Sequence, residues 1–337
     1  MSSVGLTLAL AGTVLLYFSG LNAGGEEAST LLWTHLHSLG SELNPELVKI
    51  AFVFLLIGYG TKIGLVPMHT WLPDAHGKAP TPISALLSAV LLNVALFALI
   101  RVKMISDLSV GTEFTGTLLY ILGFLSVGIA ALSLLRQNNY KRLFAYSSIE
   151  NMGLIVIGLA LATPLGVFAA LFQVINHSIA KSFSFFAAGN VLLKYQSTKI
   201  PNISNLMKVM PMTGLALMLA AVAMTGFPPF SIFLSKFSLL WGLSDAPGWM
   251  LWLLLGLLVI VFVGFLYNLM RLVFNHKPVS DTTDDNGHVH TPEGVRISAW
   301  NSAAMILNGT LMLGLGLMLP LGLTVYLAKL TELVLNY

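Results

Sequence analysis

The sequence predicts an all-α, polytopic membrane protein. Of its 337 residues, 56% are hydrophobic and only 9% are charged, whereas a soluble domain carries about 25% charged residues. Uncharged stretches such as 115–135 and 246–270 are long enough to cross about 30 Å of hydrocarbon. Since lipid offers no hydrogen bonds, the backbone groups of these stretches must pair within helices. The mean hydropathy of +0.84 agrees with this class.

The apolar stretches predict about nine spans. They are 4–20, 47–66, 83–101, 115–135, 145–163, 166–193, 213–243, 249–271 and 300–326. The first has no basic segment before it and no clear cleavage site, so we expect a span and not a signal peptide. We expect one transmembrane domain over 1–337, with a core at 47–271, a cytoplasmic loop at 272–299 and a C-terminal helix at 300–326.

Two of the spans are predicted to be broken helices, near 62–82 and 224–236. The second span ends at Pro67, and the seventh contains Gly226, Pro228 and Pro229. A proline removes a backbone donor and clashes with the preceding turn, so it interrupts a helix. Broken helices at corresponding positions of two halves indicate the ion site of a transporter.

Three lysines, Lys62, Lys181 and Lys236, lie deep inside apolar segments. A charged residue at the bilayer centre costs about 2.5–3.5 kcal/mol on insertion scales, so such residues usually serve a function. Lys62 precedes the first break and is interpreted either as a proton-binding lysine or as a lysine snorkelling from a helix end. Lys236 follows the second break and is either a proton carrier or a lone structural lysine.

The sixth span places His177 and Lys181 four residues apart, on one face of a helix. With Asn176, Ser178 and Ser182 nearby, the pattern favours a hydrated path, and a structural polar clasp between helices is the alternative. Glu150, in the fifth span, is either an acid partner for one of these lysines or a charge near a helix cap.

His69, Asp74 and His76 follow the first break in a polar turn. The histidines titrate near neutral pH and could form a proton entrance, or they could fix a re-entrant loop by hydrogen bonds. No third ligand follows at a useful spacing, so no metal site is predicted. The chain has no cysteine and no nucleotide-binding motif, so we expect no cofactor in it.

The basic residues predict the orientation. With the N-terminus in the cytoplasm, ten fall on that side and four on the other, as the positive-inside rule requires. The ten are Lys78, Arg136, Lys141, Arg142, Lys194, Lys199, Lys208, Arg271, Lys277 and Arg296, and the four are Lys49, Arg101, Lys103 and Lys329.

The segment 64–85, GLVPMHTWLPDAHGKAPTPISA, resembles the antiporter-like proton-translocating subunits of respiratory complex I, Mrp-type cation/proton antiporters and group 4 membrane-bound hydrogenases. The segments 142–153, 177–181 and 226–236 resemble later motifs of that family in the same order. The sequences at 150–153, 175–178 and 91–101 look most like those of hydrogenase 4 component F.

The resemblance implies a fourteen-helix fold with two inverted five-helix repeats, each holding a broken helix, and this chain would begin near the sixth helix. It implies that protons pass along Lys62, the His177/Lys181 pair and Lys236. The sequence departs from the family at three places. No upstream glutamate stands opposite Lys62, Ser88 and Asn93 replace a histidine or lysine found in many relatives, and Gln173 replaces a histidine found in some.

These features predict a proton-conducting subunit of a complex-I-like or hydrogenase assembly, in an oxidoreductase complex but without a redox centre of its own. The implied partners are other membrane subunits, soluble-arm subunits with iron–sulfur clusters and, in a hydrogenase, nickel–iron chemistry, and the lipid bilayer; no nucleic acid is implied. The location would be a bacterial or archaeal cytoplasmic membrane. The alternatives are a Na⁺/H⁺ antiporter subunit of Mrp type and a structural membrane anchor.

Overall fold

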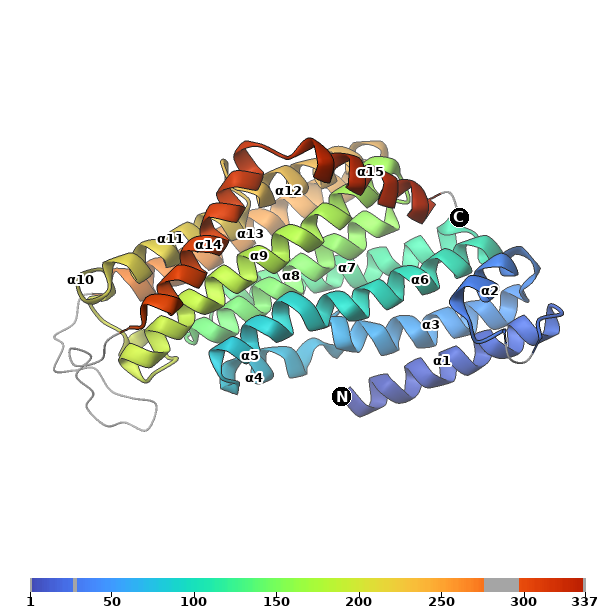
Figure 1. Cartoon of the computed structure of the whole chain (residues 1–337), viewed down its shortest axis with the longest axis horizontal. Helices are drawn as coiled ribbons and strands as arrows, with labels where there is room; N and C mark the ends of the chain where they lie inside the picture. Colours follow the sequence, from blue (N-terminus) through green and yellow to red (C-terminus); the bar gives the residue numbers. More distant parts are fainter. Residues whose placement is uncertain (1, 27–28, 276–296, 336–337) are drawn as a thin grey trace.

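The computed structural model describes residues 2–26, 29–275 and 297–335, and this part of the chain is helical without a β-strand. Figure 1 shows an elongated bundle in which most helices run along the long axis. The helices are α1 (Ser2–Asn22), α2 (Trp33–Ser38), α3 (Pro45–Ile63), α4 (Trp71–Lys78), α5 (Thr81–Leu86), α6 (Leu92–Val110), α7 (Thr112–Leu134), α8 (Tyr140–Ala160), α9 (Pro164–Tyr195), α10 (Leu206–Val209), α11 (Pro211–Thr225), α12 (Ser231–Gly242), α13 (Gly248–Val273), α14 (Ala299–Leu317) and α15 (Leu321–Leu335).

The predicted class, an all-α polytopic membrane protein, is confirmed. Six helical segments of the described part are long and apolar enough to cross a membrane, and a seventh forms if α14 and α15, bent by 78°, count as one. The nine predicted spans differ from these at three places. The sixth, α9, has 32 residues, but polar residues in its middle lower its hydropathy. The seventh is divided into α11 and α12, and the ninth is bent between α14 and α15.

Local sequence signals explain where the long helices begin. The side chain of Asn44 accepts hydrogen bonds from the backbone N–H groups of Glu46 and Leu47, which caps α3. Asn139 caps α8 in the same way. Thr163 caps α9 just before a proline at the first helical position. These side chains satisfy backbone donors that have no partner within the helix.

Both predicted helix breaks are present. Gly64, with φ +85°, directly follows the last residue of α3, and Gly226, with φ +83°, directly follows that of α11. A positive φ suits glycine because it has no Cβ. At the first break, the indole N–H of Trp71 donates to the carbonyl oxygen of Thr61 at 2.6 Å. The polar turn expected after Pro67 is instead the short helix α4.

Several basic residues that the sequence analysis places in loops lie in helices. Lys103 is in the second half of α6, Lys141 is in the first turn of α8 and Lys194 is in the last turn of α9, and all three are buried. The helices extend further than the predicted spans at these ends, so these three charges lie in helices and not in loops. Most of the predicted loop 272–299 lies outside the described residues.

Helix α8 occupies the middle of the bundle, between α7 and α9 (Figure 1). All of its residues are buried except Arg142 and Tyr146. Helices α4, α12 and α13 also contact it. A polar side chain on α8 is therefore surrounded by protein and not by lipid, and it needs a protein partner.

Close packing of α7 on α8 depends on glycine. A Cβ atom on Gly123 would lie 2.6 Å from a side-chain atom of Ile157 and 3.0 Å from the carbonyl oxygen of Gly153. Gly128, on the same helix, has open space around it. Small residues let membrane helices approach each other closely.

We predict that Gly123→Leu lowers the free energy of unfolding by at least about 1–3 kcal/mol, because the added side chain overpacks the α7–α8 contact. The matched variant Gly128→Leu should leave stability unchanged. Thermal unfolding in mild detergent measures both. Equal effects of the two variants would contradict the packing described here.

Candidate functional site

The site centres on a buried ion pair between α12 and α8. The Nζ atom of Lys236 lies 2.9 Å from Oε1 of Glu150. The Lys236 residue is 5% exposed and Glu150 is 0% exposed. Breaking one member of such a pair would leave an uncompensated charge inside the protein, which is strongly unfavourable. Glu150 lies in the middle of α8 and not at its cap.

Lys236 also ties together the two halves of the broken helix. Its Nζ atom donates a second hydrogen bond to the carbonyl oxygen of Met224, near the end of α11, at 3.0 Å. Gly226 makes room for the lysine, since a Cβ atom there would lie 2.8 Å from Cδ of Lys236. The break between α11 and α12 therefore provides both a free carbonyl acceptor and space for the lysine side chain.

Lys181 and His177 face the same region from α9. Lys181 is completely buried and donates to the carbonyl oxygen of Phe144 at 2.6 Å and to the hydroxyl group of Ser147. Both acceptors lie on α8, one and two turns before Glu150. His177, one helical turn before Lys181, is 1% exposed. Lys181 is thus bonded to the helix that carries the carboxylate, and His177 lies one turn away on the same face of α9.

Lys62 is placed differently from the other two lysines. It is half-buried in the last turn of α3 and forms no ion pair with a residue that the structure describes. Its break is nevertheless anchored on the bundle, because the backbone N–H of Val66 donates to the hydroxyl group of Ser126 on α7 at 3.0 Å.

The three residues of the predicted proton entrance have separate environments. Asp74 is exposed and its carboxylate lies 3.5 Å from the guanidinium of Arg142. His69 is half-buried, with its ring 6.5 Å from that of Tyr146. His76 is completely buried, and its ring stacks on Phe185 at 5.2 Å between centroids.

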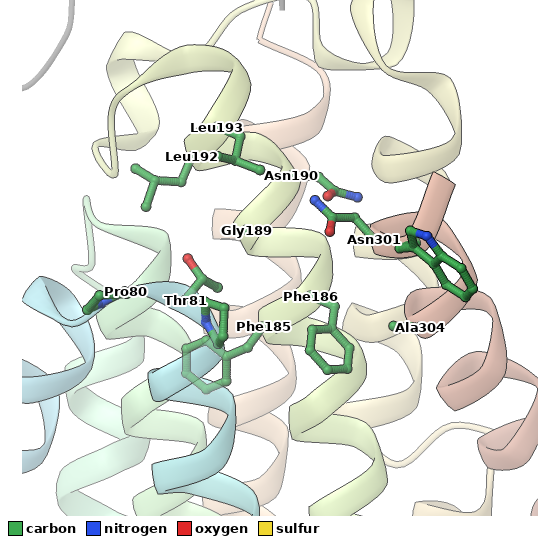
Figure 2. A pocket seen from close by; sticks show the side chains of 12 residues that line it. Pro80, Thr81, Phe185, Phe186, Gly189, Asn190, Leu192, Leu193, Asn301 and Ala304 are labelled. Atoms are coloured by element: carbon green, nitrogen blue, oxygen red, sulfur yellow. The ribbon is translucent and has the colours of Figure 1, made fainter. Parts of the chain in front are cut away.

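A cavity of about 440 Å³ opens near His76 between α5, α9 and α14 (Figure 2). Its wall is mostly apolar and includes Thr81 and Phe185, with Asn190 and Asn301 as polar residues. The ring of Phe185 both lines this cavity and stacks on His76. None of the three buried charges described above lines it, so the cavity is separate from the ion pair.

Several polar residues around Glu150 were not predicted to belong to the site. Asn151, Gln173 and Ser235 are buried and connect α8, α9 and α12 by hydrogen bonds. Lys141 was missed as a buried residue: it is 1% exposed and donates to the carbonyl oxygen of Ala79 at 2.6 Å. The available signal was the frequency of amide side chains within apolar segments, since a buried amide needs a partner.

Comparison with known proteins decides the family. A family model described as "NADH:quinone oxidoreductase/Mrp antiporter, TM" matches residues 1–262. The chain belongs to this family. The resemblance predicted from the motifs, including that to hydrogenase 4 components, is confirmed.

Two curated relatives from this family carry hydrogenase names. The "Hydrogenase-4 component F homolog" of Methylacidiphilum infernorum is 44% identical over 240 residues, which cover 71% of this chain and 50% of the relative. The "Hydrogenase-4 component B" of Escherichia coli is 33% identical over 243 residues, or 68% of this chain and 35% of the relative. This chain therefore spans half or less of the length of these two family members.

Solved structures share the fold. A chain of the membrane-bound sulfane sulfur reductase, an archaeal respiratory membrane complex, superposes with a TM-score of 0.84 at 28% identity, covering 99% of this chain and 64% of that chain. A chain of respiratory complex I from Thermus thermophilus gives 0.71 at 26% identity, with 94% and 64% covered. The Mrp complex from Dietzia sp. gives 0.80 at 23% identity, covering 99% and 66%, which shows the fold alone.

The buried ion pair predicts strong thermodynamic coupling between its members. Glu150→Gln should lower the free energy of unfolding by about 3–5 kcal/mol, because it removes the partner of a buried lysine. The double variant Glu150→Gln/Lys236→Met should lose clearly less than the sum of the two single variants. Chemical or thermal unfolding of the four proteins gives this coupling energy.

The exposed pair of Lys49 and Glu46, 2.9 Å apart, serves as the control. Glu46→Gln should cost less than about 1 kcal/mol, because water screens the pair. Additive losses for the buried pair would contradict the ion pair.

Proposed function

We propose that this chain is a proton-conducting membrane subunit of a complex-I-like or hydrogenase-type assembly. The observation that carries the proposal is the buried pair of Lys236 and Glu150 beside a broken helix, with Lys181 on the neighbouring helix. Intramembrane ionisable residues that face the interior of a bundle usually mark ion or proton paths. The family and the hydrogenase names of two relatives support the kind of assembly.

The chemistry follows from moving one charge relative to another. A carboxylate next to an ammonium group stabilises the proton on the lysine, and separation of the two removes that stabilisation. In a bundle interior such a separation is effective because the low dielectric strengthens the interaction. We assign proton binding to Lys236 and Lys181, with Glu150 as the carboxylate that responds to them and His177 as a neighbouring proton carrier.

The first half of the path is assigned to Lys62 at the break after α3. His69, Asp74 and His76 stay candidates for the entrance. They lie near the beginning of α8, which is its cytoplasmic end in the orientation that we propose. We place the N-terminus of this chain in the cytoplasm and the protein in a bacterial or archaeal cytoplasmic membrane. Lys236 would then lie toward the outer side of the membrane.

Protons fit the site better than sodium ions do. A sodium site usually needs several oxygen ligands, including carboxylates. Among the described residues, Glu150 is the only acidic residue that is buried, and Lys236 already occupies one of its oxygens. The amine of a lysine exchanges a proton but does not bind a cation.

Electron transfer is assigned to other subunits. The sequence has no cysteine for an iron–sulfur cluster. We propose that soluble-arm partners carry iron–sulfur clusters and, in a hydrogenase, nickel–iron chemistry, and that neighbouring membrane subunits contact this chain.

We predict that Lys236→Met and Lys181→Met each reduce proton transfer at least about tenfold, because each removes a proton-binding amine from the path. The assembled complex is reconstituted in liposomes with a pH-sensitive dye inside, and an imposed potassium diffusion potential drives proton uptake. This assay needs no knowledge of the electron donor.

Lys49→Met, on the exposed end of α3, should retain the rate of the unmodified protein. The subunit content of each preparation shows whether assembly is intact. Unchanged proton uptake in Lys236→Met, with normal assembly, would refute the proposed function. A loss of uptake that sodium restores would favour the Na⁺/H⁺ alternative.

A further inference from the structure

Two consecutive residues of α8 are tied to two consecutive residues of α12. Glu150 binds Lys236 directly, at 2.9 Å. Asn151 is connected to Ser235 through a third side chain, Gln173 of α9. The three helices are therefore joined by a closed arrangement of polar contacts around the carboxylate.

The hydrogen bonds that link these side chains run in one direction, from Ser235 through Gln173 and Asn151 to Glu150. The hydroxyl group of Ser235 donates to Oε1 of Gln173, and the amide of Gln173 donates from Nε2 to Oδ1 of Asn151. Asn151 in turn donates from Nδ2 to Oε2 of Glu150 at 2.6 Å, and to the carbonyl oxygen of Ser147 at 2.6 Å. Successive hydrogen bonds with one direction polarise each other, and here they support negative charge on the carboxylate.

The three side chains of this chain of hydrogen bonds are buried, so losing a partner would be costly for each of them. Asn151 is 1%, Gln173 is 3% and Ser235 is 1% exposed. Asn176 fixes the far end, because its Nδ2 donates to the hydroxyl oxygen of Ser235 at 3.0 Å and to the carbonyl oxygen of Ser231 at 3.1 Å. Leaving a buried polar group without a partner costs about 1–3 kcal/mol, so the chain of contacts has one strongly preferred arrangement.

We propose that Gln173 is a positioning residue that holds the Glu150 carboxylate in place through Asn151 and couples it, through Ser235, to the position of α12. The inference rests on the proposed function, since it assigns a role within the same site. A displacement of α12 would move Lys236 and Ser235 together, because they are neighbours on one helix. The ion pair with Glu150 and the hydrogen bonds through Gln173 to Asn151 would then weaken together.

The same chemistry makes the amide chain a support and not a proton path. Neutral carboxamides donate and accept hydrogen bonds but keep their protons near neutral pH. A proton that reaches Lys236 must therefore leave on another side of the lysine. The carbonyl oxygen of Met224 and the break between α11 and α12 lie on such a side.

The test compares Gln173→Met with Gln173→Glu in the liposome assay. Methionine fills a similar volume but makes neither hydrogen bond, so proton uptake should fall at least about tenfold at every pH. A neutral glutamic acid can donate to Asn151 and accept from Ser235, whereas its ionised form has no donor and adds a second carboxylate near Glu150. Gln173→Glu should therefore approach the unmodified rate at acid pH and lose it as the pH rises.

Other charged groups near the amide chain are the same in Gln173→Met and Gln173→Glu, so they do not produce the difference between these two variants. They are Glu150 on α8, Lys236 on α12, and His177 and Lys181 on α9 itself. Gln137→Met, in the connection between α7 and α8, is the control for the substitution and should behave as the unmodified protein.

A double-variant cycle separates positioning from a general structural effect. If Gln173 acts through Glu150, the loss caused by Gln173→Met should largely disappear in a Glu150→Gln background. Rates for Gln173→Met equal to the unmodified protein, identical pH profiles for Gln173→Met and Gln173→Glu, or fully additive losses would each overturn the inference. If Lys236→Met, prepared in the same way, is inactive, a result that overturns the role of Gln173 still leaves the proposed function standing.

Discussion

The buried pair of Lys236 and Glu150 is the interaction on which the rest of the structure depends. Two opposite charges inside an apolar bundle are tolerated only when each has a close partner and its remaining polar atoms are bonded. The carbonyl oxygen of Met224 completes the shell of the lysine, and Asn151 completes that of the carboxylate. Helix α8 must therefore be central, and α12 must begin beside it, so the broken helix is a requirement of the site.

Helix α8 both packs in the centre of the bundle and carries the polar groups that bind the two lysines. Its buried face carries Ser147 and Glu150, which receive a lysine from α9 and a lysine from α12, respectively. Glycines on α7 and α8 allow close approach of their backbones, which keeps lipid away from these polar groups. A rigid central helix with one carboxylate between two lysines gives a small charge displacement a large energetic effect, because the surroundings are poorly polarisable.

Much of this could be predicted from the sequence. Apolar segments and prolines located most helices and both breaks, and the spacing of His177 and Lys181 placed them on one face. The helix ends were less predictable: α6, α8 and α9 extend past the apolar segments because they continue with polar residues that find partners in the fold. The pairing of Glu150 with Lys236 could not be deduced from periodicity, since 86 residues separate them and only tertiary packing brings them together. The hydrogen bonds of Gln173 join three helices and have no local signature in the sequence.

In the proposed function, the Lys236–Glu150 pair opens and closes as protons move. Cryo-electron microscopy of the assembled complex, at rest and during turnover, tests it most directly. We expect that part of the molecules during turnover have Lys236 withdrawn from Glu150, with ordered water between Lys181 and Lys236. A pair that keeps the same 2.9 Å contact in every state, with no water reaching either lysine, would contradict it.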